Sequence, residues 1–333
     1  MTSPRVLITG AGGFVGRHLA AALAAAGVDA AGLDRPLAGV EVADDPLVRW
    51  RRELGTSPGD GAATLADLLA AQSFTAVCHL AGQSSAGASF ADPAGTIAAN
   101  VGGTVEVLEA LRRLKAAGRP VPRLLVVGSA EEYGGAARPD RPCREDDPLQ
   151  PLSPYATSKA AATQLTSQYH QAFGLPVLAV RAFNHTGPGQ DRRFVFPAFA
   201  HQIAAIEAGR QEPVLRTGNL TACRDFLDVR DVVRAYTLLL ERGRPGRIYN
   251  VCSGSALTIA GGLEILLGLS TARIEVTTDP SRLRPVDVPR LIGDPTALRD
   301  ATGWRPRLTI AQTLGDLLEG ARASLARPGG ETT

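Results

Sequence analysis

The sequence predicts an α/β protein built on a doubly wound parallel sheet, because two hydrophobic periodicities alternate along its first half. Short runs rich in Val, Leu and Ile predict strands at RVLITG, VDAAGLD, TAVCHLAG, RLLVVGS and PVLAVRAFN. Ala- and Leu-rich stretches with helical period lie between them: FVGRHLAAALAAAG, ATLADLLAAQ, GTVEVLEALRRLKAA and SPYATSKAAATQLTSQYHQAFG. Neighbouring parallel strands are joined by right-handed crossovers, so helices should cover both faces of the sheet.

The second half of the chain predicts a smaller, irregular lobe. From about Asn184 glycine and proline become more frequent, segments shorten, and arginines cluster in RDFLDVRDVVR and DPSRLRPVDVPR. One strand-like run, RIYNVCSG, is expected to return to the main sheet, so the two parts interleave. The expected division is a sheet domain at 1–184 to which 226–254 partly returns, a lobe at 185–225 and 255–326, and a tail at 327–333.

Composition excludes several classes of protein. A chain of 333 residues suggests about two domains, and 44% hydrophobic with 20% charged residues is typical of globular proteins. The net charge of +2, without a basic run, argues against nucleic-acid binding. Four scattered cysteines and five histidines form no metal-ligand spacing. With no secretory signal or apolar run of 18 residues, we expect no membrane association, a cytoplasmic location and no bound metal.

The first strand is followed by LITGAGGFVGRHLA, which places Gly10, Gly13 and Gly16 between a strand and a helix. Glycines there let the backbone turn tightly and approach a pyrophosphate at the positive end of the helix. This strand, turn and helix context predicts a dinucleotide-binding Rossmann fold, with Phe14 and Val15 in the same turn. The alternative is a glycine-rich turn that only tightens helix against strand.

The end of the second strand bears on the choice of cofactor. Asp34 lies about 18 residues after the glycines, where a carboxylate can bind the two hydroxyl groups of an adenosine ribose. The same carboxylate repels a 2′-phosphate, so NAD is favoured over NADP. Arg35 beside it can bind a phosphate, and NADP therefore stays open.

Tyr155 and Lys159 in SPYATSKAAATQL lie one helical turn apart. Side chains at i and i+4 share a helix face, and Pro154 favours a helix start just before the tyrosine. A nearby ammonium favours phenolate over phenol, so Lys159 is expected to lower the tyrosine pKa from its usual value of about 10. Such a phenol can exchange a proton with a carbonyl or alcohol while a nicotinamide exchanges hydride. An ordinary surface helix is the alternative interpretation.

Position strengthens the catalytic interpretation. Ligands of doubly wound proteins bind at the carboxyl ends of the strands. Ser129 ends the strand RLLVVGS, where its hydroxyl can bond the same substrate oxygen as Tyr155. The residues expected at such ends are Gly10, Asp34, Gly82, Ser129 and Asn184.

The combination of GxxGxxG with HLAGQSS, GSAEEYG and YATSK resembles the extended short-chain dehydrogenase/reductases that act on nucleotide sugars, over nearly the whole chain. The resemblance implies a catalytic set of Ser129, Tyr155 and Lys159, the last two also contacting the cofactor. It implies further cofactor contacts from Leu80, Ala81 and Gly82. Asn100 is implied as a structural and proton-relay position, and a helix-packing amide is the equal alternative.

The segments RAFNHTGPGQ, TGNLTACRDFLDVRDVVRAY and DPSRLRPVDVPRLIGD resemble the GDP-mannose branch, and within it the GDP-6-deoxy-4-keto-D-mannose reductases that make GDP-D-rhamnose. The related 4,6-dehydratases typically continue FNHESP and carry an arginine-rich NADP signature, whereas this chain has FNHTGPGQ and Asp34. Reduction of a C4 ketone with Tyr155 as proton donor is therefore the leading hypothesis. A 4,6-dehydratase or a 4-epimerase remains the alternative, and a non-catalytic NAD-binding scaffold is a third.

The acids after Ser129 bear on this choice. Glu131 is in the position of the dehydratase glutamate that removes the C5 proton, so it is a candidate for catalysis and substrate binding. Ala130, in place of the common serine or threonine, favours simple reduction. Glu132 is expected to be solvated.

The nucleotide end of a GDP-sugar requires cations, because a diphosphate carries about two negative charges and arginine binds phosphate oxygens in bidentate fashion. By motif position the candidates are Arg224 and Arg284, although Arg224 can instead pair with Asp225 or Asp228. Asn184 and Asn219 can bind diphosphate or sugar, and Ser84 lies where family members contact the hexose. The resemblance also implies a homodimer, for which the alanine-rich helix of Tyr155 offers a close-packing face.

Overall fold

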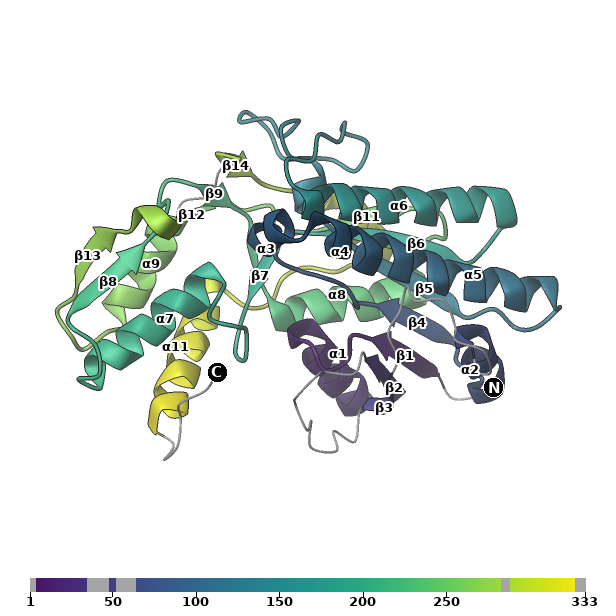
Figure 1. Ribbon diagram of the computed structural model, residues 1–333, viewed down its shortest axis with the longest axis horizontal. Coiled ribbons are helices and arrows are strands. Elements are labelled where there is room, and N and C mark those ends of the chain that lie inside the picture. Colours follow the sequence, from purple (N-terminus) through teal and green to yellow (C-terminus); the bar gives the residue numbers. More distant parts are fainter. Residues whose placement is uncertain (1–3, 35–47, 52–63, 283–287, 327–333) are drawn as a thin grey trace.

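A computed structural model describes residues 4–34, 48–51, 64–282 and 288–326, with only the backbone at 48–51. Its centre is a parallel seven-stranded sheet of order β11-β6-β5-β4-β1-β2-β3 (Figure 1). This confirms the doubly wound Rossmann fold, whose strand order reverses beside β1. The strands are β1 (Arg5–Thr9), β2 (Asp29–Asp34), β3 (Val48–Arg51), β4 (Ala76–His79), β5 (Arg123–Ser129), β6 (Val177–Ala182) and β11 (Ile248–Val251).

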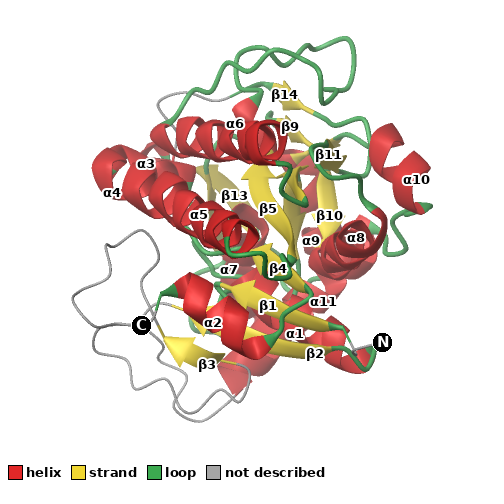
Figure 2. Cartoon of the chain, turned by 90° about the vertical axis from the view of Figure 1, so that its right-hand side faces the viewer, coloured by secondary structure: helices red, strands yellow, loops and turns green. Residues whose placement is uncertain are grey.

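Helices cover both faces of this sheet, as Figure 2 shows. Side chains alternate along each strand and pack into two cores, one on each face of the sheet. Val6 and Ile8 therefore face one layer of helices, and Leu7 faces the other. The first layer contains α1 (Phe14–Ala25), α8 (Val229–Arg242) and α10 (Thr296–Thr302). The second contains α2 (Leu65–Gln72), α5 (Gly103–Ala116) and α6 (Pro154–Phe173).

Local sequence fixes both ends of α6. The Ser153 hydroxyl accepts a hydrogen bond from the Ala156 amide at 3.1 Å, and Pro154 occupies the first turn. Gly174 ends the helix in a left-handed conformation with φ of 59°. Tyr155 is therefore held in the first turn, at the carboxyl edge of the sheet.

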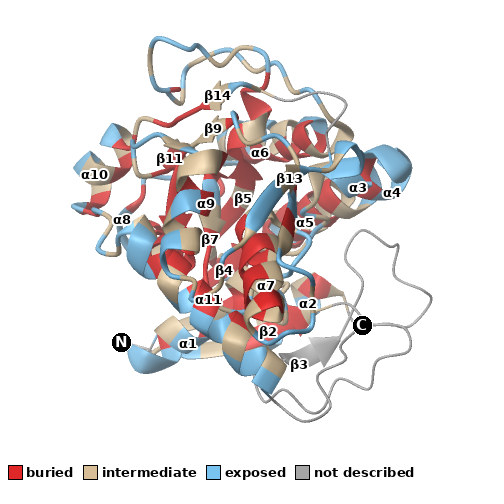
Figure 3. Cartoon of the chain, turned by 90° about the vertical axis from the view of Figure 1, so that its left-hand side faces the viewer, coloured by how far each residue is buried: buried red, intermediate tan, exposed pale blue. Residues whose placement is uncertain are grey.

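The smaller lobe has its own core between α7 (Val195–Glu207), α9 (Ile259–Gly268) and α11 (Ile310–Ala326). Figure 3 looks onto this lobe and colours each residue by how far it is buried. Its strands are β8 (Val214–Thr217) paired with β13 (Glu275–Thr278), and β9 (Cys223–Arg224) between β12 (Leu257–Thr258) and β14 (Arg290–Leu291). The run RIYNVCSG supplies β11 at the edge of the main sheet beside β6, while the domain boundaries stay predictions.

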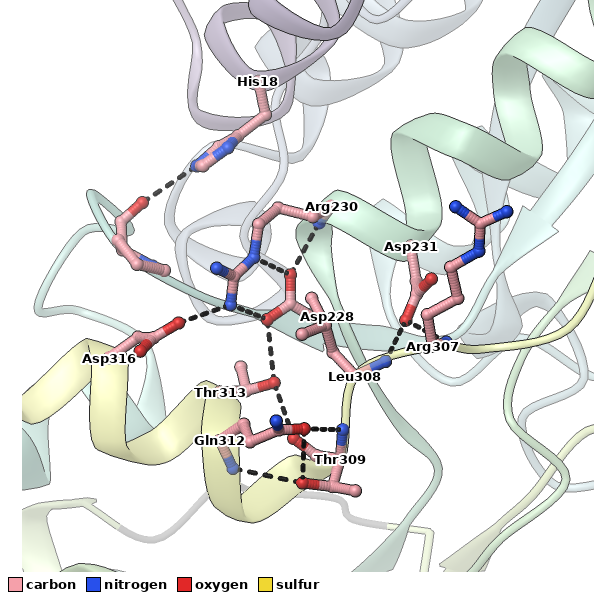
Figure 4. A network of polar contacts seen from close by, with 11 residues as sticks. His18, Asp228, Arg230, Asp231, Arg307, Leu308, Thr309, Gln312, Thr313 and Asp316 are labelled. Atoms are coloured by element: carbon pink, nitrogen blue, oxygen red, sulfur yellow. Dashed lines mark hydrogen bonds and ion pairs between the residues drawn. The ribbon is translucent and has the colours of Figure 1, made fainter.

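A polar seam joins the lobe to the sheet domain (Figure 4). The buried Asp228 carboxylate accepts bonds from the Arg230 guanidinium at 2.7 and 2.9 Å and from the Thr313 hydroxyl of α11 at 2.8 Å. Arg230 also pairs with Asp316 of α11 at 2.6 Å. Asp228, the cap residue of α8, and Arg230 in its first turn thus hold α11 against the sheet domain.

Short elements complete the rim of the site: α3 (Ala86–Ala91), α4 (Pro93–Ile97), β7 (Asn184–Thr186) and β10 (Phe226–Asp228). Arg35, Arg284 and the tail at 327–333 lie outside the described residues. Within the described part of the chain, no helix combines the length and apolar character needed to cross a membrane.

One expectation is wrong: Glu132 is not solvated but fully buried, because Arg181 of β6 lies against it.

Candidate active site

A cavity of about 1340 Å³ runs along the carboxyl ends of the strands and between the two parts of the molecule. It brings together most of the residues that the sequence singles out. The predicted residues that line it are Gly10, Gly13, Phe14, Val15, Gly16, Asp34, Leu80, Ala81, Gly82, Ser84, Ser129, Glu131, Tyr155, Lys159, Asn184, Asn219 and Arg224.

The glycine turn forms one end of the cavity. Gly10 has φ of 72°, and a Cβ there would lie 2.8 Å from the Ala81 nitrogen. A Cβ on Gly16 would lie 2.6 Å from the Ala11 carbonyl oxygen and closer still to that of Gly10. Both glycines therefore allow the turn to pack tightly, which brings the start of α1 with its unpaired first amides to the cavity wall, and this cradle fits the pyrophosphate of a dinucleotide.

Asp34 stands beside this cradle at the end of β2. Its Oδ2 accepts the Gly12 amide at 2.8 Å, so the carboxylate also fixes the glycine turn. An acid at the cavity wall, next to the turn, fits the adenosine ribose of NAD(P). The residues present thus suit a dinucleotide that would be held by the glycine turn and Asp34.

Asp34→Asn tests the contribution of this charge while keeping an acceptor for the Gly12 amide. Removing the negative charge should raise the affinity for NADPH relative to NADH about fivefold or more, since a charge pair 4 Å apart is worth about 1 kcal/mol even in water. Dissociation constants for both cofactors, from nucleotide fluorescence, measure the ratio. An unchanged ratio would show that Asp34 does not face the 2′ position.

The three catalytic candidates meet in the middle of the cavity. Ser129 and the half-buried Tyr155 both line the cavity, and the Ser129 hydroxyl lies near enough to favour the ionised form of Tyr155. Lys159 is buried and its Nζ donates to the Val127 carbonyl oxygen of β5 at 3.0 Å. Burial lowers the pKa of Lys159 to about 8, so this amine is charged at neutral pH and close to titrating.

The expected lowering of the tyrosine pKa is wrong for this state of the protein. Burial raises the pKa of Tyr155, the Glu131 carboxylate raises it further, and the nearby Ser129 hydroxyl opposes them only in part. Desolvation disfavours phenolate more than the surrounding groups favour it. Tyr155 is therefore a phenol at neutral pH, which is the form that can donate a proton.

Asn100 is the exception among the described candidates, because it does not line the cavity. Its side chain accepts the Gln83 amide at 2.8 Å and donates to the Gln83 carbonyl at 3.1 Å and to the Ser158 hydroxyl at 2.8 Å. It lies in a π-helical turn, Ala98–Gly102, before α5. These contacts support the packing alternative, with Asn100 holding the HLAG loop against α6.

The other end of the cavity is formed by the lobe. Arg224 of β9 lines it and donates to the carbonyl oxygens of Cys223 at 2.9 Å and Val288 at 2.6 Å. The acids weighed as its partners are engaged elsewhere: Asp225 accepts bonds from Ser253 and Gly254, and Asp228 pairs with Arg230. Two backbone contacts thus hold the Arg224 guanidinium at the cavity.

Further cations line the cavity that sequence reasoning missed: Arg17, Arg192, Arg193 and Arg282. The pair Arg192 and Arg193 follows FNHTGPGQ after one intervening residue, so extending that motif by three residues would have found it. Arg282 precedes the predicted Arg284 by two positions, and Arg17 follows the glycine turn.

The Rossmann sheet and the Ser129, Tyr155 and Lys159 cluster define an extended short-chain dehydrogenase/reductase, an NAD(P)-dependent class of enzyme. The sequence model of the GDP-mannose 4,6 dehydratase family matches residues 7–317, and the chain belongs to that family. It is 38% identical to GDP-6-deoxy-D-mannose reductase of Pseudomonas aeruginosa over 94% of this chain and 96% of that one. It is 31% identical to GDP-mannose 4,6-dehydratase of Sinorhizobium fredii over 70% of each chain.

Solved structures agree with this assignment. RMD from Pseudomonas aeruginosa complexed with NADPH superposes with a TM-score of 0.80 at 36% identity, covering 96% of this chain and 99% of that one. UDP-glucose 4-epimerase of Thermus thermophilus in complex with NAD gives 0.81 at 29% identity, with the same coverage. The resemblance to extended short-chain dehydrogenase/reductases is thus confirmed, while NAD and NADP both occur among similar structures.

Proposed function

We propose that this enzyme reduces the C4 ketone of GDP-4-keto-6-deoxy-D-mannose to GDP-D-rhamnose, also called GDP-6-deoxy-D-mannose. The observation that carries the proposal is Tyr155, a phenol that lines the same cavity as Ser129, Lys159 and the glycine turn. The full-length similarity to a GDP-6-deoxy-D-mannose reductase supports the choice of substrate.

Each residue of the site has a separate role in the reduction of a ketone. Bound NAD(P)H supplies the hydride that reduces C4. Tyr155 donates its proton to the C4 oxygen, and Ser129 donates a hydrogen bond to the same oxygen, which holds the carbonyl in place. The Lys159 ammonium, charged below pH of about 8, stabilises the phenolate that remains.

At the far end of the cavity we propose that arginines bind the diphosphate of GDP. Arg224 faces the cavity from β9, and Arg192 and Arg193 lie at its wall, so their cations can meet two phosphates together. Arg284 stays a prediction by motif position. Ser84, Asn184 and Asn219 are proposed to bind sugar or diphosphate oxygens.

Elimination of water on the same scaffold is the second candidate, because Glu131 lines the cavity close enough to Tyr155 to raise its pKa. A dehydratase needs such a carboxylate to remove the C5 proton, whereas a reductase does not. Ala130 is buried beside it and offers no hydroxyl to the leaving group. A 4-epimerase would use Tyr155 and Ser129 alone, without net consumption of cofactor.

Glu131→Gln separates these functions. Ketone reduction should fall by less than tenfold, because the proton donor and its partner remain, whereas any elimination from GDP-mannose should be lost. The assay follows oxidation of NAD(P)H with the ketone and product formation from GDP-mannose. A 100-fold loss of ketone reduction would contradict the assignment of Tyr155 as the only proton donor.

We further propose a homodimer located in the cytoplasm. All four cysteines lie in the described part of the chain as free thiols, in keeping with a reducing compartment. Phe90, Ile97 and Phe173 are exposed apolar side chains on α3, α4 and α6 that a second copy of the chain could cover. Light scattering coupled to gel filtration measures the mass, and a monomer at micromolar concentration would contradict the dimer.

The substrate assignment is tested by offering GDP-mannose and its 4-keto-6-deoxy derivative separately with NADH and with NADPH. The proposal expects oxidation of reduced cofactor only with the ketone. Turnover of GDP-mannose without net oxidation would instead establish a dehydratase or an epimerase.

A further inference from the structure

A buried carboxylate lies directly behind the catalytic candidates. Glu132 has no exposed surface, and its Oε1 accepts the backbone N–H of Ser129 at 2.9 Å. Its Oε2 accepts the Thr163 hydroxyl at 2.8 Å and the Arg181 Nε at 2.9 Å. Thr163 lies on α6, one turn beyond Lys159 and two beyond Tyr155. One side chain therefore touches the strand end that carries Ser129 and the helix that carries the other two candidates.

Arg181, the cationic partner of Glu132, is itself held by further hydrogen bonds. Arg181, 2% exposed, donates from Nη1 to the Tyr133 hydroxyl at 3.1 Å and to the Glu145 carbonyl at 2.9 Å. The Tyr133 hydroxyl donates to Asn250 of β11 at 2.7 Å. Burial raises the pKa of Glu132, while the Arg181 charge and the hydrogen bonds from Ser129, Thr163 and Arg181 act in the opposite direction. Two of these partners, a backbone amide and a guanidinium, can only donate, which favours the ionised carboxylate. A fully bonded network of this kind permits one arrangement of its members.

The chain also leaves room for this carboxylate. A Cβ on Gly128 would collide with the Glu132 Oε1 and lie 2.5 Å from the Thr163 Cγ2. Gly128 directly precedes Ser129, so the backbone beside the catalytic serine is shaped to admit Glu132. This steric observation is independent of the hydrogen bonds, and it also indicates that the Glu132 carboxylate belongs beside the catalytic serine.

We propose that Glu132 is a positioning residue of the active site, which sets the Ser129 backbone against α6 and so aligns the Ser129 and Tyr155 hydroxyls. The inference deepens the proposed ketone reduction and rests on it. Glu132 touches neither cofactor nor substrate, and its effect reaches the reaction through Ser129, Thr163 and its charge.

The charge of Glu132 acts on Lys159. Burial lowers the pKa of Lys159, and Glu132 is the charge that opposes this. The other titratable groups around Lys159 are His79 of β4, which burial and the Lys159 charge keep neutral, Tyr155 of the same helix and Glu131. Loss of the Glu132 charge should lower the pKa of Lys159 and also that of Tyr155, which Glu132 raises.

Glu132→Gln tests the proposal with little change of shape. A carboxamide has one acceptor oxygen, which the Arg181 cation will bind. The amide NH₂ then faces the Ser129 N–H and cannot accept its hydrogen bond. We expect kcat for ketone reduction to fall about 10- to 100-fold with KM changed less than threefold, because small misalignments of reacting groups have effects of this size. The alkaline limb of the pH profile of kcat should move to lower pH.

A second readout does not depend on turnover. Lysine occurs only at positions 115 and 159, so protein labelled with ¹³C at lysine Cε gives two signals, and Lys115→Arg assigns them. In the cofactor-free protein, Glu132→Gln should lower the midpoint of the Lys159 titration and leave that of Lys115 unchanged. Glu145→Gln is the matched control, since Glu145 accepts the Asn250 amide at 2.8 Å and has no bond to Ser129 or α6.

Glu132→Met with Arg181→Met separates positioning from stability. Replacing a buried ion pair by apolar side chains often leaves stability intact, so the double variant should unfold near the wild-type temperature and still show the reduced kcat. Recovery of wild-type kcat in the double variant would overturn the proposal, as would a Glu132→Gln enzyme with unchanged kcat and Lys159 titration. A wild-type enzyme that fails to reduce the ketone would overturn the proposed function instead, and the Lys159 titration would still decide the role of Glu132.

Discussion

Replacing Tyr155 by Phe lowers kcat for ketone reduction by about 100- to 10,000-fold, the range that a general acid contributes. The substitution removes one oxygen, the hydroxyl that lies near Ser129 and is protonated at neutral pH. The ring remains against the cavity, so the affinity for reduced cofactor should change less than threefold. Stopped-flow reduction of the ketone and fluorescence titration with NADPH measure the two quantities.

Tyr169→Phe is the matched control, because Tyr169 lies on the same helix and its hydroxyl donates to Glu109 at 2.8 Å, away from the cavity. It should lower the free energy of unfolding by about 1 kcal/mol, the usual contribution of one hydrogen bond, and leave kcat within twofold. Equal losses of kcat in the two variants would mean that Tyr155 acts through folding and does not donate the proton.

Gly16→Ala should weaken cofactor binding, because a methyl group there meets the carbonyl oxygens of Gly10 and Ala11. The start of α1 must move, which displaces the amides that face the pyrophosphate. Overpacking of this kind costs about 1–3 kcal/mol, so the affinity for NADPH should fall roughly 10- to 100-fold. Titration calorimetry measures the affinity, and thermal unfolding measures the accompanying loss of stability.

Gly320→Ala serves as the comparison, since Gly320 lies within α11 and a methyl group there meets no atom within 4 Å. Alanine in a helix interior should stabilise the protein by about 0.5–1 kcal/mol and leave the affinity unchanged. Wild-type affinity in Gly16→Ala would show that the glycine turn does not form the cofactor site.

The fold is predictable because its signals are local. The alternation of short apolar runs with helical stretches gives β1, β2, β4, β5 and β6 in order, and RIYNVCSG gives β11. The site is predictable where one strand end or one helical turn places the residue, as for Ser129 and for Tyr155 with Lys159. These placements need only the knowledge that strand ends meet at one edge of a parallel sheet.

The features of the site that the sequence cannot show are set by contacts between residues far apart in the chain. Glu132 lies 49 positions before Arg181, and nothing beside it indicates burial, so the sequence alone suggests a solvated acid. The helical spacing relates the pKa of Tyr155 to Lys159 alone, although burial of the ring decides its direction. Family position suggests a proton relay for Asn100, and only the structure shows its amide bonded to Gln83 and Ser158.

The central claim is that hydride reaches C4 of a nucleotide-sugar ketone while Tyr155 protonates its oxygen. The most direct measurement uses GDP-4-keto-6-deoxy-D-mannose with reduced cofactor deuterated at the transferable position, followed by NMR of the product. We predict one deuterium at C4 of a product with the D-rhamno configuration, formed by the wild type and not detectably by Tyr155→Phe. Deuterium at any other carbon, or an unchanged ketone after prolonged incubation with either cofactor, would contradict this account.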